Sequence, residues 1–180
     1  YLSNHSSGKM GYALAQAALD AGADVTLVSG PVCLAAPSGV SLLAAVSCDE
    51  MLDQVMSRID DQDVFIGCAA VSDYRIEQIA TQKIKKSADN MTLNLVKNPD
   101  ILAIVAGLDD RPFCVGFAAE TQQLEQYAND KLKRKNLDMI AANRVDGAET
   151  GFEVDENALT VYWSEGHSEL ARNTKTVIAQ

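Results

Sequence analysis

Hydrophobic positions along this chain follow two periods, one typical of amphipathic helices and the other of buried strands. Apolar residues at i, i+3, i+4 and i+7 predict helices at residues 9–21, 47–59, 99–108 and 122–132. Short apolar runs between turn-forming residues predict strands at residues 24–28, 40–46, 63–67, 112–117, 138–142 and 158–163. A last helix is expected to begin near Asn173.

Strands that alternate with helices in this way pair into a parallel sheet covered by helices. We therefore expect an α/β fold with a doubly wound, mostly parallel, Rossmann-like sheet. Residues 83–86 and 91–97 flank an Asp-Asn pair and predict a β-hairpin that protrudes as a flap. Because the chain begins at Tyr1, we expect residues 1–180 to be a single domain truncated at both ends.

Capping signals mark the starts of the predicted helices. Ser47 and Glu50 have the spacing of a capping box. Asn98 is the expected N-cap of the next helix, with Pro99 and Asp100 in its first turn. Thr121 is the expected cap of the helix that follows.

A polar loop at residues 4–8 leads directly into the first predicted helix. Unpaired N–H groups at a helix start attract phosphate, and Ser6, Ser7 and Lys9 add donors and charge. An ordinary capped surface helix is the alternative reading. Neither standard phosphate motif fits, since Ser3 replaces the first glycine of a P-loop and no Gly-x-Gly-x-x-Gly is present.

Small and polar residues follow several predicted strands, where open α/β sheets bind ligands. Alanine pairs at residues 69–70, 118–119 and 141–142 suggest a ligand lying across this edge of the sheet. Asp73 comes shortly after the first pair and either contacts that ligand or caps a turn.

Lysines gather at two places in an otherwise acidic chain. The flap carries Lys83 and its neighbours, either as a basic cover for a polyphosphate or as a solvated edge. Lys131 and Lys135 border the apolar stripe of a helix, and they either snorkel or point into a cleft.

The composition of the chain limits which classes of function are possible for it. The formal net charge of −10 excludes nucleic acid as a bulk partner, although a local basic patch can hold a nucleotide. The 4 cysteines form no C-x-x-C pair, which favours reduced core thiols in a cytoplasmic protein over disulfides or zinc. No apolar run reaches membrane-spanning length. Residue chemistry alone thus indicates an α/β domain with a phosphate-rich ligand.

Segments spread in order over almost the whole chain resemble the bacterial phosphopantothenoylcysteine synthetase family. They are residues 3–11, 28–31, 69–74, 83–86, 96–101, 116–121 and 135–138. The resemblance implies that CTP activates 4′-phosphopantothenate as an acyl-cytidylate, which cysteine then converts to an amide. It also implies Mg²⁺, a homodimer and a flavin-dependent decarboxylase domain in the full-length protein.

The resemblance also implies roles for individual residues. Asn4 looks like the asparagine needed for reaction with cysteine, and Lys83 like the flap lysine of activation. By their chemistry, Asp73 and Asp100 could each hold the metal or the nucleotide, and Asp73 is the predicted metal-binding residue. Positions similar to those around CTP are Gly67, Cys68, Ala69, Asp73, Lys83, Pro99, Asp100, Ile101, Leu102, Phe117, Lys131 and Lys135. Positions similar to those around phosphopantothenate are Asn4, Ser6, Ser7, Gly8, Ala69 and Ala70.

Two other functions compete with this one. A nicotinamide-dependent oxidoreductase would share the doubly wound sheet, but the glycine fingerprint is missing. A non-catalytic nucleotide-binding module would share the site but release no pyrophosphate.

Overall fold

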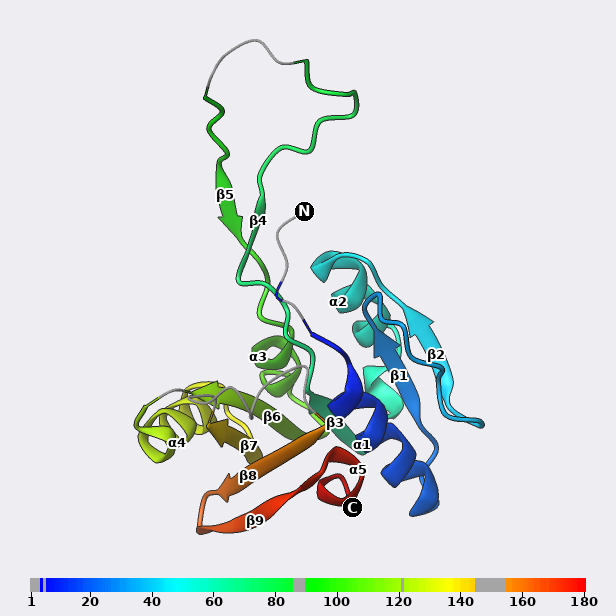
Figure 1. The fold of residues 1–180 in the computed structure, drawn as a ribbon, viewed down its shortest axis with the longest axis vertical. Coiled ribbons are helices and arrows are strands. Elements are labelled where there is room, and N and C mark those ends of the chain that lie inside the picture. Colours follow the sequence, from blue (N-terminus) through cyan, green and yellow to red (C-terminus); the bar gives the residue numbers. More distant parts are fainter. Residues whose placement is uncertain (1–3, 5, 86–89, 121, 145–154) are drawn as a thin grey trace.

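The computed structural model describes residues 4, 6–85, 90–120, 122–144 and 155–180 (Figure 1). The helices of this part are α1 (Lys9–Asp20), α2 (Cys48–Met56), α3 (Ile101–Ala106), α4 (Leu124–Arg134) and α5 (Lys175–Ile178), with a 3-10 turn at Ile59–Asp61. The strands are β1 (Thr26–Ser29), β2 (Ser41–Ala44), β3 (Val64–Gly67), β4 (Tyr74–Ile76), β5 (Leu95–Lys97), β6 (Phe113–Glu120), β7 (Met139–Arg144), β8 (Glu156–Trp163) and β9 (Gly166–Thr174). Among the described helices, none combines the length and apolar character needed to cross a membrane.

The described strands form a five-stranded sheet in the order β3-β6-β7-β8-β9, a parallel pair β1-β2 and the ladder β4-β5. β3, β6 and β7 run parallel, which confirms an α/β fold with a parallel-containing sheet. β8 and β9 run antiparallel to their neighbours, so the sheet is mixed rather than parallel throughout. For β9 the reason is the short turn after β8, in which Trp163 pairs with Gly166, because a parallel crossover needs a much longer connection.

Strand β9 was not predicted, because its side chains lack the alternation on which such predictions depend. It forms the edge of the five-stranded sheet, and most of its residues are exposed. An edge strand with polar side chains needs no apolar face of its own. The last helix begins at Lys175, capped by Thr174, close to the expected start near Asn173.

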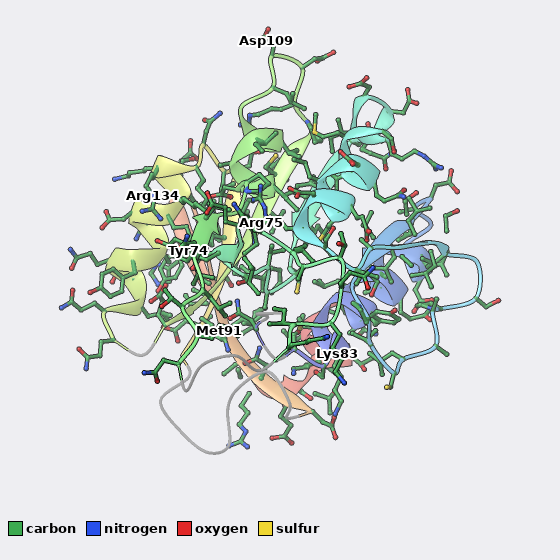
Figure 2. All side chains as sticks on the ribbon, turned by 90° about the horizontal axis from the view of Figure 1, so that it is seen from above. Tyr74, Arg75, Lys83, Met91, Asp109 and Arg134 are labelled. Atoms are coloured by element: carbon green, nitrogen blue, oxygen red, sulfur yellow. The ribbon has the colours of Figure 1, made fainter. Side chains whose placement is uncertain are left out.

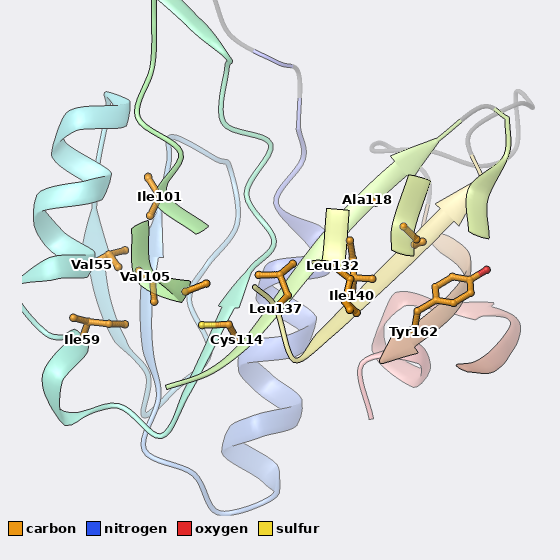
Figure 3. Close-up of a cluster of buried hydrophobic side chains, with 13 residues drawn as sticks. Val55, Ile59, Ile101, Val105, Cys114, Ala118, Leu132, Leu137, Ile140 and Tyr162 are labelled. Atoms are coloured by element: carbon orange, nitrogen blue, oxygen red, sulfur yellow. The ribbon is translucent and has the colours of Figure 1, made fainter. Parts of the chain in front are cut away.

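The hydrophobic core lies between the strands β6 and β7 and the helices that cover them (Figure 3). Val105 from α3, Cys114 from β6 and Ile140 from β7 are its largest side chains with no exposed surface. Ala118 and Ala142 pair across β6 and β7 and are also buried. The alanine pairs on these two strands therefore lie within the strands instead of following their ends, and one alanine of each pair packs in the core.

The helix starts confirm one of the predicted caps and correct another. At α2 the Ser47 side chain accepts from the Glu50 N–H, and the Glu50 carboxylate accepts from the Ser47 N–H, as a capping box requires. At α3 the cap is Asp100, whose Oδ1 accepts from the Ala103 N–H at 3.1 Å. The prediction of Asn98 as this cap is wrong. The cap predicted for α4, Thr121, lies outside the described residues, and the helix begins after Gln123.

The flap is a hairpin that projects from the rest of the molecule (Figure 1). Its ladder joins β4 to β5, with Tyr74 opposite Lys97 and Ile76 opposite Leu95. The predicted pairing of residues 83–86 with residues 91–97 is wrong for the part that the structure describes, because residues 83–85 form no strand there. Residue 86 lies outside the described part. The strand β4 was missed because Tyr74–Ile76 is too short to show a period.

An ion pair between Arg111 and Asp138 ties the start of β6 to the start of β7. Both terminal nitrogens of Arg111 donate to the carboxylate of Asp138. The Cys114 N–H donates to the same carboxylate at 2.7 Å. Arg111 thereby holds the pKa of the Asp138 carboxyl below its usual range, although partial burial opposes this.

Replacing Asp138 with asparagine is expected to lower the free energy of unfolding by about 1–3 kcal/mol at pH 7, because charge-assisted hydrogen bonds are lost. A carboxyl whose pKa is lowered by folding stabilises the protein above its unfolded pKa of 3.8 and stops doing so as the pH falls through the folded value. Urea titrations at pH 7 and below pH 4 test this, and the difference between variant and wild type should shrink in acid. Asp109→Asn, an exposed loop change, is the control; equal stability of Asp138→Asn and wild type at pH 7 contradicts the prediction.

Candidate active site

The opening loop lies against the segment that follows β3. The side-chain amide of Asn4 donates to the Val71 carbonyl at 3.3 Å, across 67 residues of sequence. Val71 comes directly after Ala69 and Ala70, and the Cys68 N–H turns the chain by donating to the Ile66 carbonyl at 3.2 Å. The fold therefore brings Asn4 together with the alanine pair predicted to bind the same substrate.

Serine hydroxyls and backbone N–H groups gather at the first turn of α1. Gly8 is its N-cap in a left-handed conformation (φ 74°) and has no side chain with which to cap the helix. A Cβ at Gly8 would lie 2.9 Å from Val32 Cγ1, so only glycine fits. Ser6 accepts from the Gly8 N–H at 3.4 Å and Ser7 from the Lys9 N–H at 3.5 Å. Hydroxyls and N–H groups thus converge where the helix dipole is positive.

The C-terminal helix α5 packs against α1, the helix that follows this loop. The sequence did not indicate this contact. Lys9 at the start of α1 pairs with Asp155, with Nζ and Oδ1 at 2.5 Å. The backbone N–H of Lys175 in α5 donates to the Asp155 carbonyl at 2.9 Å, and the Lys175 side chain is buried. Burial, together with nearby Lys9, lowers the pKa of Lys175.

Cys68 stays a neutral thiol at physiological pH. Burial raises its pKa to about 11, although the positive charge of Lys175 opposes the shift. A thiol with so high a pKa is a poor nucleophile.

Two glycines let α3 lie close to the parallel strands. A Cβ at Gly67 would lie 3.1 Å from Leu102 Cδ1, and one at Gly116 would lie 3.0 Å from Leu102 Cδ2. The predicted nucleotide residues Gly67 and Leu102 are therefore in contact. Ile101, the first residue of the helix, is buried in the core.

Replacing Gly116 with alanine is expected to destabilise the fold by about 1–3 kcal/mol through overpacking. The new Cβ would lie 2.8 Å from Leu137 Cδ1, inside the core. Thermal or urea unfolding measures the effect. Gly11→Ala is the matched control, since nothing lies within 4 Å of its Cβ position and alanine favours a helix interior. Equal destabilisation of the two variants would contradict the packing argument.

Lysines of α4 meet the predicted nucleotide residues of β6 and α3. Lys131 Nζ donates to the Phe117 carbonyl at 2.7 Å. Lys135 Nζ lies 2.7 Å from Asp100 Oδ2, with the Lys135 side chain only 18% exposed. Both lysines therefore point toward the predicted site rather than snorkelling to solvent. Burial, then the neighbouring Lys135 charge, lowers the pKa of Lys131.

The Asp100 carboxylate serves two partners at once. It caps α3 through the Ala103 N–H and pairs with Lys135. Partial burial would raise its pKa, but these two bonds outweigh burial and hold the pKa below its usual range. Asp100 is therefore a charged carboxylate at neutral pH. It directly follows Pro99, another of the predicted nucleotide residues.

The whole chain, residues 1–180, matches the model of a family described as the DNA/pantothenate metabolism flavoprotein C-terminal domain. The chain belongs to this family. Membership confirms the resemblance drawn from the sequence, and the oxidoreductase alternative finds no support in these matches.

Relatives within this flavoprotein C-terminal domain family carry a common name. The chain is 56% identical over 182 residues to the coenzyme A biosynthesis bifunctional protein CoaBC of Vibrio cholerae, covering 99% of this chain and 46% of the relative. It is 50% identical over 184 residues to the protein of that name in Escherichia coli, covering 100% and 45%. The chain thus spans about half the length of the curated relatives it matches.

Solved structures of the family have the same fold. A crystal structure of the C-terminal domain of CoaBC superposes with a TM-score of 0.82 at 37% identity, covering 99% of this chain and 80% of that one. The DNA/pantothenate metabolism flavoprotein of Streptococcus pneumoniae superposes with a TM-score of 0.81 at 22% identity, covering 99% and 86%.

Some predicted site residues lie apart from the rest. Lys83 is exposed on the flap loop, which Figure 2 views from above. Within the described chain the flap extends away from the ends of β3 and β6 (Figure 1). Asp73 is exposed at the flap base, and no group of three acidic, histidine or cysteine side chains in the described part could hold a metal.

Proposed function

We propose that this chain, as part of a flavoprotein C-terminal domain protein, joins 4′-phosphopantothenate to cysteine with CTP as the activating nucleotide. The observation that carries the proposal is the hydrogen bond from Asn4 to Val71, in the segment that follows Ala69, beside the serine hydroxyls at the start of α1. The shared name of the CoaBC relatives, which places them in coenzyme A biosynthesis, supports it.

In the first step, a carboxylate oxygen of phosphopantothenate attacks the α-phosphorus of CTP. The bond from that phosphorus to the bridging oxygen breaks, pyrophosphate leaves and an acyl-cytidylate forms. Little covalent work falls to the protein, so positioning and charge neutralisation dominate. We assign Lys83 of the flap to the charge that develops on the phosphates.

In the second step, the amine of cysteine attacks the acyl carbon, CMP leaves and the amine gives up a proton. The Asn4 amide can both donate and accept hydrogen bonds, and its Nδ2 donates to the Val71 carbonyl in this structure. In the reaction we assign an N–H of this amide to the acyl oxygen and Oδ1 to the attacking amine. Ser6, Ser7 and Gly8 lie beside Asn4 in sequence and suit the adjoining phosphate group.

We assign CTP to the surface where α3, β6 and α4 meet. There Lys131 contacts Phe117, and Lys135 contacts Asp100. The remaining proposed nucleotide contacts are Gly67, Cys68, Ala69, Asp73, Pro99, Ile101 and Leu102.

Lys135→Ala is expected to raise the KM for CTP about 10- to 100-fold, the usual cost of a lost charge-assisted bond. Steady-state kinetics with varied CTP measure it, with the KM for cysteine as an internal reference. Lys133→Ala is the matched control, because Lys133 is exposed on the same helix. Similar KM values for CTP in both variants would show that Lys135 does not contribute to the nucleotide site.

Asp73 suits a magnesium ion that arrives with the nucleotide. Mg²⁺ in nucleotide sites commonly takes one or two carboxylates and completes its shell with phosphates and water. Asp73 is a single exposed carboxylate, and its backbone carbonyl accepts from Asn98, two residues before Asp100 of the proposed CTP surface, which fits that pattern. When bound, the ion would neutralise part of the triphosphate charge, which matters in a chain of net charge −10.

A second copy of this chain is the proposed partner of the flap. Apolar flap side chains that project into solvent support this: Ile79 (84% exposed), Met91 (67%) and Ile84 (62%). A homodimer would cover them and could bring Lys83 to the site of the other copy. Sedimentation should therefore give a dimer that Met91→Glu weakens. We also propose that the full-length protein is cytoplasmic and carries a decarboxylase domain; the word bifunctional in the names of the relatives supports a second domain.

One assay tests the proposed reaction. The full-length protein is incubated with CTP, phosphopantothenate, cysteine and Mg²⁺, and pyrophosphate and CMP are measured. We expect pyrophosphate only when phosphopantothenate is present, and CMP only when cysteine is added. If no pyrophosphate forms with or without cysteine, the protein is a non-catalytic nucleotide-binding module. Thermal stabilisation by NADPH but not by CTP would favour an oxidoreductase.

A further inference from the structure

Few packing contacts of the described flap residues hold the flap in one direction relative to the rest of the protein. Its ladder consists of three residue pairs and continues by one bond, from the Glu77 N–H to the Asn94 carbonyl at 2.9 Å. Tyr74 and Leu95 on this ladder are 52% and 45% exposed. An isolated two-stranded ribbon is marginally stable at best, so its base must supply the anchoring.

The guanidinium group of Arg75 spans the base of the flap. Arg75 lies on β4, and its Nη1 donates to the Lys97 carbonyl and to Asn98 Oδ1, each at 3.1 Å. Its Nε lies 3.7 Å from Asp49 in the first turn of α2. Arg75 therefore connects both flap strands to each other and to the body of the protein.

Asn98 continues this connection. Its Nδ2 donates to the Ser72 carbonyl at 2.7 Å, and its backbone N–H donates to the Asp73 carbonyl at 2.8 Å. The chain entering the flap is thus fixed to the chain leaving it. Asp73 follows Ser72 in the sequence, and Pro99 follows Asn98. Both Asp73 and Pro99 are assigned to the nucleotide site.

The start of α2 contacts the same base from the body of the protein. Cys48 Sγ lies 3.6 Å from the Pro99 carbonyl, and Asp49 faces Arg75. The Arg75–Asp49 pair is exposed on both sides and so contributes little by itself. The bonds of Arg75 and Asn98 to backbone carbonyls carry most of the anchoring.

We propose that Arg75 and Asn98 are positioning residues that hold the two nucleotide segments side by side and aim the flap with Lys83. The inference rests on the proposed function, since its kinetic part needs CTP as substrate. Arginine is required rather than a positive charge alone, because one planar group reaches a carbonyl, an amide oxygen and Asp49 together. Lysine in its place cannot reproduce that geometry.

Hydrogen exchange in the absence of substrate tests the anchoring. We expect faster amide exchange in β4 and β5 of Arg75→Ala and Asn98→Ala, with the exchange of β6 and β7 unchanged. Arg58→Ala is the matched control, an exposed arginine outside the flap. Unchanged exchange in β4 and β5 would overturn the proposal, as would faster exchange throughout the protein.

Kinetics of the same full-length variants test the positioning. We expect the rate of pyrophosphate release to fall about tenfold or more and the KM for CTP to rise, with the KM for cysteine unchanged. Arg75→Lys should behave like Arg75→Ala. Full activity in Arg75→Lys, or an equal change in the KM for cysteine, would overturn the role. If the unmodified protein releases no pyrophosphate from CTP, the proposed function fails, while the exchange result still decides the anchoring.

Discussion

Asn4→Asp is expected to stop amide formation while leaving acyl-cytidylate formation largely intact. A carboxylate has the shape of the amide but accepts hydrogen bonds only, so it cannot donate to the acyl oxygen or to the Val71 carbonyl. Loss of one preorganised donor to developing negative charge typically costs about 10²–10³ in rate. Pyrophosphate release should therefore give a burst that matches the enzyme concentration, followed by slow turnover.

Rapid quenching and chromatography of the nucleotides measure this result directly. The acyl-cytidylate should accumulate on Asn4→Asp and be absent from the wild type once cysteine is added. Asn129→Asp, the same chemical change on the exposed face of α4, is the control and should turn over normally. Unchanged CMP release by Asn4→Asp would show that Asn4 does not act in the second step.

Lys83→Gln is expected to slow the first step, in contrast to Asn4→Asp. Glutamine keeps most of the side-chain length but loses the positive charge that would face the phosphates as pyrophosphate leaves. The expected loss is about 10²–10³ in the rate of pyrophosphate release, with no accumulated intermediate. Single-turnover kinetics with saturating CTP separate this slow chemistry from weak binding.

Lys85→Gln is the matched control for Lys83. Both lysines are exposed on the same loop of the flap, two positions apart, so they change the net charge of the flap equally. A general electrostatic effect would slow both variants to the same extent and would weaken with added salt. Equal rates in the two variants would therefore remove the specific role of Lys83.

Local patterns in the sequence determined most of the helices and the central strands. The capping box of Ser47 and Glu50 needs only neighbours along the chain, so it could be predicted. The period of apolar residues likewise placed α1, α4, β3 and β6 to within a few residues. Asn98 shows the limit of such signals, because its side chain binds Ser72 instead of capping α3.

Edge and flap strands lacked a local signal. β4 and β9 expose most of their side chains, so neither burial nor alternation marks them in the sequence. Their pairing is fixed by partners, β5 for one and β8 for the other. The predicted hairpin was right in kind but misplaced, since strand pairing depends on which segment is available and not on the turn residues alone.

The sequence by itself determined the family, the opening loop and the choice of Asn4, because these depend on residue types in a fixed order. Only the tertiary structure decided which of them meet. It placed Asn4 against Val71, Lys135 against Asp100, and Arg75 against Asn98, contacts that join distant segments. Such contacts follow from how strands and helices pack, and hydrophobic periodicity carries no information about which polar side chains the packing brings together.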